Sequence, residues 1–195
     1  MGQVIELVPP RVERINLEVT GTSPLICHRW SEKAKKAMVD KQSKAPTRAK
    51  DKRDPKRDYE DSLYRRADGG YGFPSVGFKA AVVRAGTYAD MHMTFLRGAF
   101  HVNGELVPVT GEPSMREDMV RLSGKVADIR YRAQFVEWSA VVPIHLNTSV
   151  LSLEQLANLF VIAGFAVGVG EWRPERNGQY GRFEVSSIET YREAA

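Results

Sequence analysis

The sequence has little of what several large classes of protein depend on. Cys27 is the only cysteine among 195 residues, which excludes an internal disulfide and a zinc cluster of cysteines. The N-terminal residues contain no apolar run of the kind that a signal peptide has. The longest apolar stretch, residues 159–170, is well short of the ~20 residues that span a bilayer. We therefore expect a cytoplasmic protein that does not contact a membrane.

Positive charge is in modest excess, and it is concentrated in one segment. The whole chain carries 28 Lys and Arg against 24 Asp and Glu, a net charge of +4. Residues 33–66 alone contain 13 Lys and Arg and 6 Asp and Glu, so this segment carries +7 and the remainder −3. Charge that served only solubility would be spread over the chain. Its concentration favours a polyanionic partner, such as a nucleic acid.

The pattern of apolar residues predicts one α+β domain that spans residues 1–195. Residues 13–20 alternate between polar and apolar side chains, as a half-buried strand does. Residues 31–72 follow, and apart from a short basic helix at their start they show almost no apolar periodicity. A loop of this length inside a compact domain is usually functional or disordered. We therefore predict a basic, mobile insertion at 31–72, after the first strand.

The rest of the chain supplies the other elements of the domain. A helix is predicted with Ser75 as its N-cap, and two strands are predicted around Asn103-Gly104, a dipeptide typical of tight hairpins. The longest strand candidate lies within 126–147, and a capping box at Ser152 opens a second long helix. A last strand closes the chain. The order is βαββαβ, a ferredoxin-like (RRM-like) core with an antiparallel sheet, whose open face often binds single-stranded RNA.

The most distinctive stretch is the glycine-rich loop, residues 168–183, GVGEWRPERNGQYGRF. Its arginines can bind phosphates, and Trp172 and Tyr180 can stack on bases, which favours contact with a single strand. The loop does not match nucleotide-binding motifs. No Lys-Ser or Lys-Thr pair follows the glycines, and the loop follows a helix whereas a Rossmann turn follows a strand. The alternative is a plain connection, in which the glycines serve turn geometry and Trp172 covers the core.

A ferredoxin-like core whose last helix runs into such a loop, ahead of the final strand, resembles the RAMP superfamily of CRISPR-associated proteins. The basic insertion and the helix PSVGFKAAVVRAG after it are similar to features of the backbone subunits that polymerise along a guide RNA. The resemblance implies a protein that binds single-stranded nucleic acid, and it does not by itself imply catalysis. We therefore expect a non-enzymatic protein that forms a homo-oligomer or filament along the strand. It leaves room for a relative that acts on phage or plasmid single-stranded DNA, so RNA and DNA are both candidate ligands.

The residues assigned to this interface come from the loop, from the insertion and from the helix after it. Tyrosines stand beside arginines in the insertion, which is the interleaving expected for single strands. A solvated charged loop is the alternative for the insertion, and an exposed helix edge is the alternative for Lys79 and Arg84. The candidate nucleic-acid-binding residues are Arg29, Lys33, Lys35, Lys36, Arg57, Arg65, Arg66, Lys79, Arg84, Gly168, Gly170, Trp172, Arg173, Arg176, Gly178, Tyr180 and Arg182.

Two other functions stay open at the level of sequence. His28, just after the first strand, is the best-placed general base for a RAMP-type endoribonuclease, although no histidine or tyrosine partner is near it in sequence. The other histidines, His92, His101 and His145, fall in strand candidates, and no two have the spacing of metal ligands on one element. No metal site and no cofactor are therefore expected. A phage structural or interaction protein, whose basic segment binds another protein, is the third hypothesis.

Overall fold

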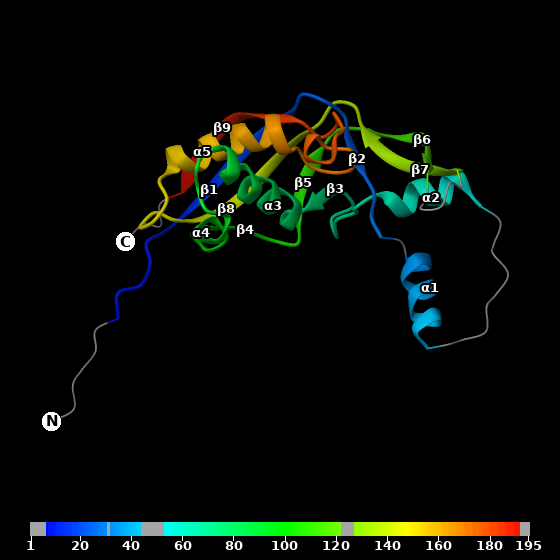
Figure 1. Cartoon of the computed structure of the whole chain (residues 1–195), viewed down its shortest axis with the longest axis horizontal. Coiled ribbons are helices and arrows are strands. Elements are labelled where there is room, and N and C mark those ends of the chain that lie inside the picture. The colour runs from blue at the N-terminus through cyan, green and yellow to red at the C-terminus, as the bar shows by residue number, and fades with distance from the viewer. Residues whose placement is uncertain (1–6, 31, 44–52, 122–126, 192–195) are drawn as a thin grey trace.

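The computed structural model describes residues 7–30, 32–43, 53–121 and 127–191. The strands of its larger sheet are β1 (Val12–Gly21), β3 (Tyr71–Pro74), β4 (Phe100–Val102), β5 (Leu106–Thr110), β8 (Ser139–Asn147) and β9 (Phe183–Tyr191). They pair antiparallel in the order β3-β5-β8-β1-β9, and β4 pairs with β8 as well. The first strand is therefore held on both sides by strands from the last third of the chain (Figure 1).

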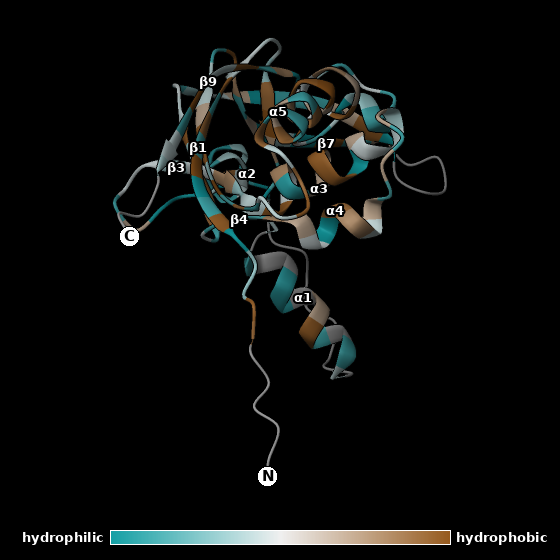
Figure 2. Cartoon of the chain, turned by 90° about the vertical axis from the view of Figure 1, so that its left-hand side faces the viewer, coloured by the Kyte–Doolittle hydropathy of each residue, from teal (hydrophilic) through white to brown (hydrophobic). Residues whose placement is uncertain are grey.

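Helices cover one face of this sheet. α3 (Ser75–Ala85) and α5 (Leu153–Ile162) lie across the strands, and α5 continues into the π-helical turn η2 (Ala163–Val167). Alternate residues of β1, such as Leu17, share one buried cluster with Phe78 of α3 and Phe160 of α5. Figure 2 shows the hydrophobic residues gathered on α3 and α5. The half-buried strand predicted at 13–20 is confirmed, because the odd-numbered side chains of β1 face these helices.

The predicted capping box at Ser152 is also confirmed. The Gln155 amide donates to Ser152 Oγ at 3.1 Å, and the Ser152 amide donates to Gln155 Oε1 at 3.0 Å. Ser75, by contrast, is not the N-cap of α3, because Pro74 occupies that position. The Ser75 hydroxyl donates instead to the Gly104 carbonyl at 2.6 Å. It therefore ties the start of α3 to the turn that precedes β5.

The predicted hairpin at Asn103-Gly104 is wrong. The stretch before it is mostly helical, because α4 (Met93–Ala99) follows the short 3-10 turn η1 (Gly86–Tyr88) and leaves only β4 as a strand. β4 and β5 do not pair with each other as the arms of a hairpin would. Both pair with β8, so the dipeptide turns the chain between two strands that share one neighbour.

A second sheet was not foreseen from the sequence. It contains β2 (Leu25–Cys27), β6 (Pro113–Arg121) and β7 (Ala127–Phe135), in the order β2-β7-β6. β6 and β7 form a long antiparallel pair, here called the β6-β7 ribbon, which extends from the main sheet. The single long strand predicted within 126–147 is therefore two strands, β7 and β8, in different sheets. Val136 lies in the turn between them and is exposed.

Part of the segment predicted as a mobile insertion has regular structure. α1 (Glu32–Gln42) stands away from the body in Figure 1, and residues 44–52 lie outside the described residues. α2 (Pro55–Ser62) begins at Asp54, whose side chain accepts hydrogen bonds from the Lys56 and Arg57 amides at 3.0 and 3.2 Å. An aspartate N-cap followed by proline is a strong helix-start signal, so this helix could have been read from the sequence.

α2 is fastened to the second sheet. The Ala133 amide of β7 donates to Ser62 Oγ at 2.8 Å, and Leu63, directly after α2, is only 2% exposed within the main core. For residues 53–72, a packed helix and the approach to β3 thus replace the irregular loop that we predicted. The structure as a whole is α+β with antiparallel sheets, consistent with a ferredoxin-type fold. Among the described residues, no helix has the length and hydrophobicity to cross a membrane.

The packing of Leu63 gives a test of this corrected insertion. Replacing Leu63 by Ala should lower the free energy of unfolding by about 2–5 kcal/mol, because it removes buried methyl groups and leaves a cavity. Met38→Ala on α1 is the matched control, since Met38 is 53% exposed and its truncation should cost under ~0.5 kcal/mol. Urea unfolding measures both variants. Equal, small losses would mean that the end of the insertion does not pack on the core.

Candidate nucleic-acid interface

The glycine-rich loop is folded tightly onto the segment that leads into β2. The Gly181 amide donates to the Pro24 carbonyl at 2.8 Å, and the Glu171 amide donates to the Ile26 carbonyl at 3.0 Å. Across the loop itself, the Val169 amide donates to the Gly181 carbonyl at 2.9 Å. These bonds occupy amides that a phosphate-binding loop would turn toward its ligand. Contact between the loop and a ligand therefore falls mainly to its side chains.

Gly178 and Gly181 make this close packing possible. A Cβ on Gly178 would overlap the Trp172 carbonyl oxygen, and a Cβ on Gly181 would overlap the Val169 carbonyl oxygen. Gly181 also has a φ of +65°, a conformation that side-chain-bearing residues rarely adopt. Gly178, which we predicted to contact nucleic acid, and Gly181 therefore bring the backbone close to the loop's own carbonyl groups.

On one side, the loop borders a cavity of about 600 Å³, here called the loop cavity. It is lined by Ser23, Pro24, Trp172, Arg176, Asn177, Gly178, Gln179, Tyr180 and Arg182. Five of the predicted residues therefore meet at one place. Arg176 is exposed, and Nε of Arg182 is buried with no hydrogen-bond partner in the described part of the chain. Two guanidinium groups thus stand beside two aromatic rings, a set of side chains suited to phosphates and bases.

The aromatic rings of the loop are held by arginines of the β6-β7 ribbon. The Arg116 guanidinium lies 5.5 Å from the centre of the Trp172 ring and 4.7 Å from the centre of the Tyr180 ring. Arg132 lies 5.4 Å from the Trp172 ring, and Arg116 Nη2 donates to Tyr180 Oη at 3.2 Å. These cation–π contacts fix how the rings are presented. They also show that the ribbon, which sequence reasoning missed, is part of the site.

The negative charge of Asp118 offsets part of the repulsion between Arg116 and Arg132. Arg116 and Arg132 face each other across the ribbon, where like charges repel. Asp118 Oδ1 accepts from Arg116 Nε at 2.7 Å, whereas its Oδ2 lies 3.7 Å from Arg132 Nη1, beyond hydrogen-bond distance. Burial lowers the pKa of the Arg132 guanidinium, which is only 6% exposed. The alternation of Arg130, Arg132 and Gln134 is the sequence signal of this charged strand face.

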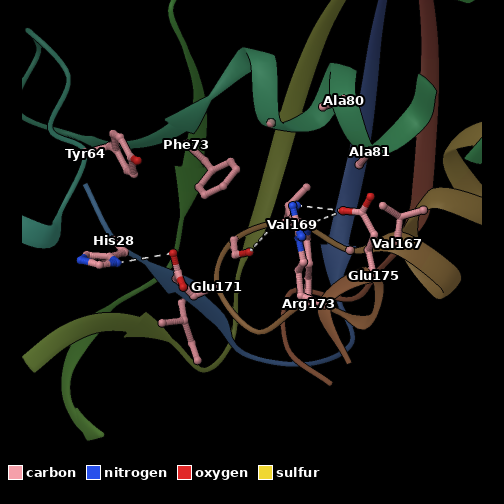
Figure 3. A pocket seen from close by; sticks show the side chains of 15 residues that line it. His28, Tyr64, Phe73, Ala80, Ala81, Val167, Val169, Glu171, Arg173 and Glu175 are labelled. Atoms are coloured by element: carbon pink, nitrogen blue, oxygen red, sulfur yellow. Dashed lines mark hydrogen bonds and ion pairs between the residues drawn. The ribbon is translucent and has the colours of Figure 1, made fainter. Parts of the chain in front are cut away.

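A second cavity, of about 330 Å³, lies between the loop, α3 and the end of β2, and is here called the α3 cavity (Figure 3). Gly168, Gly170 and Arg173 line it. Glu175 Oε2 accepts from Arg173 Nε at 3.1 Å and from Nη2 at 2.8 Å, while Nη1 donates to the Gly170 carbonyl at 3.2 Å. Arg84 of α3 pairs with the same carboxylate at 3.3 Å. Arg84 and Arg173 therefore brace the loop against α3.

His28 lies at the edge of the α3 cavity, next to a carboxylate that could orient it. Its Nδ1 is 3.4 Å from Glu171 Oε1 (Figure 3). Hydrogen bonding to His28 lowers the pKa of Glu171, which outweighs the opposing effect of burial. Tyr64 lines the same cavity, and burial raises its pKa. Glu171 lies within the predicted loop, but an acidic residue is not a sequence signal of nucleic-acid binding, whereas cations and aromatic residues are.

Four of the eight other predicted cations are paired with nearby carboxylates, so these four are not free basic groups. The ion pairs are Lys35–Glu32 (2.6 Å), Arg57–Asp61 (3.9 Å), Arg65–Glu60 (2.6 Å) and Arg66–Asp68 (2.9 Å). Lys79 Nζ lies 3.1 Å from His101 Nδ1. Lys36 is exposed, Arg29 Nε is buried without a partner among the described residues, and the Lys33 side chain lies outside the description. The local charge of this segment is therefore partly neutralised by its own acidic residues.

Comparison with known proteins gives structural relatives only. No protein-family model matches the sequence, and no curated protein matches it. A chain in a cryo-EM structure of the type III-B Cmr-beta bound to cognate target RNA is similar, with 9% identity and a TM-score of 0.54. The match covers 92% of this chain and 60% of that chain, so this protein spans about three-fifths of its length. The crystal structure of Cmr6 from Pyrococcus furiosus also matches, with 12% identity, a TM-score of 0.49, and coverage of 90% and 99%.

The likeness to the Cmr-beta chain shows a shared fold. It supports the RAMP-like fold that the sequence resemblance implied. It does not bear on the alternatives that involve a phage, which stay open.

The tight folding of the loop can be tested at Gly181. Gly181→Ala should lower the free energy of unfolding by roughly 2 kcal/mol or more, because the new Cβ would overlap the Val169 carbonyl at a positive φ. Gly98→Ala in α4 is the control, since no atom lies within 4 Å of a Cβ there. That change should be neutral or stabilise by about 0.5–1 kcal/mol. Thermal and urea unfolding compare the two, and a tolerant Gly181 would contradict the packed loop.

Proposed function

We propose that this protein binds single-stranded nucleic acid, RNA in the first place, and does not catalyse a reaction. The observation that carries the proposal is the loop cavity, where Trp172 and Tyr180 stand beside Arg176 and Arg182. Aromatic rings stack on unpaired bases and guanidinium groups bind phosphates, whatever the sequence of the strand. RNA is favoured over DNA because the Cmr-beta structure that shares the fold is bound to target RNA.

The framework of the site, in this proposal, is a ferredoxin-like βαββαβ core of the RAMP type. Its strands are β1, β4, β8 and β9, and its helices are α3 and α5. The glycine-rich loop then connects the second helix to the last strand. The β6-β7 ribbon and the segment 31–72 are additions to this core, and the ribbon reaches the loop through Arg116 and Arg132.

Assembly of several copies along one strand is the second part of the proposal. The helical face carries exposed apolar residues that a neighbouring copy would cover, among them Val76 (71% exposed) and Phe165 (77% exposed). A repeating contact between unlike surfaces produces an open filament when the rotation from copy to copy does not close a ring. Particles whose length grows with the length of the strand distinguish this arrangement from a single bound copy.

A metal-independent ribonuclease is the second candidate function, and the His28–Glu171 pair is the observation that favours it. A carboxylate can orient a histidine for proton transfer. We expect labelled RNA hairpins to stay intact when incubated with the protein in chelator. Cleavage that His28→Ala abolishes, in a variant with unchanged circular dichroism, would replace the binding proposal by this one.

The binding proposal predicts a steep dependence on salt. If each copy neutralises about five phosphates, log K should fall against log salt with a slope of roughly −3.5. Arg176→Gln and Arg182→Gln should each weaken binding of every single-stranded sequence and reduce that slope by about 0.7. Arg11→Gln removes an exposed charge ahead of β1, away from the loop cavity, and should change the slope little. Fluorescence anisotropy at several salt concentrations measures these slopes.

Two results would count against this function. One is an affinity that does not change between low and moderate salt. The other is an equal loss in Arg11→Gln and in the loop variants, since binding would then follow total charge and not the loop cavity. Double-stranded DNA should bind less tightly than single strands, because stacked base pairs leave no ring face for Trp172 and Tyr180.

A further inference from the structure

The α3 cavity has the size and walls of a pocket for one flat ring. Its volume of about 330 Å³ is at the lower end of the ~300–1,000 Å³ range of small-molecule sites. Gly77, Ala80 and Ala81 give its α3 wall only small side chains. Phe73 and Tyr64 add two aromatic rings (Figure 3), 5.9 Å apart and edge to face. One unpaired nucleoside fits such a space, whereas a base-paired strand does not.

One end of the cavity offers hydrogen-bond acceptors. The Glu171 carboxylate stands at the edge of the cavity, between His28 and Phe73 (Figure 3). Its Oε1 faces His28 Nδ1 at 3.4 Å, and within the described residues no hydrogen bond uses its Oε2. Because its pKa is lowered through the bond to His28, this carboxyl group is ionised at neutral pH and can only accept.

The other end joins the α3 cavity to the loop cavity. Arg176 lines both cavities and is exposed. A phosphate bound by Arg176 would therefore lie between a base stacked in the loop cavity and the next base in the α3 cavity. Arg173 is already paired with Glu175, which leaves Arg176 as the guanidinium available at this junction.

We propose that the α3 cavity takes the base of one guanine nucleotide turned out of the bound strand, with Glu171 as the acceptor for its N1–H and N2–H groups. The inference rests on the proposed function, since it adds base selectivity to single-strand binding. Guanine is the one common base with two adjacent donors on its Watson–Crick edge. Adenine, cytosine and uracil each place an acceptor beside their donor, and an ionised carboxylate repels that acceptor. Single-stranded RNA is commonly read on this edge.

The test uses three oligonucleotides that differ at one central position in a uridine-rich strand: guanine, inosine or adenine. Inosine keeps N1–H and lacks the N2 amine, so it isolates the second hydrogen bond. The wild-type protein should bind the guanine strand roughly tenfold more tightly than the inosine strand, as expected for the loss of one hydrogen bond to a charged group. Glu171→Gln should reduce this preference below about twofold and should bind the adenine strand at least as tightly as the wild type does, because the neutral amide no longer repels the acceptor of adenine.

The control for lost charge is Glu137→Gln, an exposed carboxylate in the turn between β7 and β8, which should keep the full guanine preference. Ala80→Leu fills the cavity from α3 without touching the carboxylate, and Ala80 is exposed, so this variant should fold. It should lose the preference as Glu171→Gln does. If Ala80→Leu binds guanine like the wild type, the cavity is not the site and the proposal is overturned.

The outcomes separate this inference from the proposed function. Equal affinity of the wild type for all three strands, with the steep salt dependence retained, would overturn the guanine site and leave single-strand binding intact. A guanine preference that persists in Glu171→Gln would also overturn it. Absence of binding to every strand would remove both proposals together.

Discussion

Main-chain hydrogen bonds between the glycine-rich loop and residues 22–26 join the two sheets of this protein. The Thr22 amide donates to the Arg182 carbonyl at 2.9 Å, and the Gly181 amide donates to the Pro24 carbonyl at 2.8 Å. The same segment continues into β2, which pairs with β7 of the ribbon. Because this segment is bound by the loop on one side and by the ribbon on the other, the loop cannot shift without disturbing both sheets. Both cavities are lined by this hydrogen-bonded loop, so their walls are already formed before a ligand binds.

Cation–π contacts, and not burial in the apolar core, fix the positions of Trp172 and Tyr180 in the loop. The guanidinium groups of Arg116 and Arg132 contact the rings of Trp172 and Tyr180, and Asp118 lies between the two arginines. Removing an arginine from water is unfavourable, and a single carboxylate offsets that cost only in part. The arrangement instead gives the loop one preferred position. Preformed orientation of stacking groups lowers the entropy lost when a strand binds.

Elements that depend on local sequence patterns could be predicted from the sequence, whereas elements that depend on contacts between distant residues could not. β1 and the start of α5 were predictable because local periodicity and a capping box agree with what the core requires. The β6-β7 ribbon was missed because its alternating face is charged and pairs with a distant loop. The basic segment was misjudged because net charge does not reveal ion pairs, and partners such as Glu60 and Asp68 lie within a few residues of their arginines. The Glu171–His28 contact joins residues far apart in the chain, so only the fold could show it.

The position of β1 has a consequence for how the chain reaches its native state. Both neighbours of this strand, β8 and β9, come far later in the chain, and the Ser23–Arg182 hydrogen bond spans 159 residues. At a ribosomal rate of ~5–20 residues per second, the first strand waits roughly 10–30 s for its partners. During that interval neither edge of the strand has its native partner. Contacts of such long range favour slow closure of the sheet.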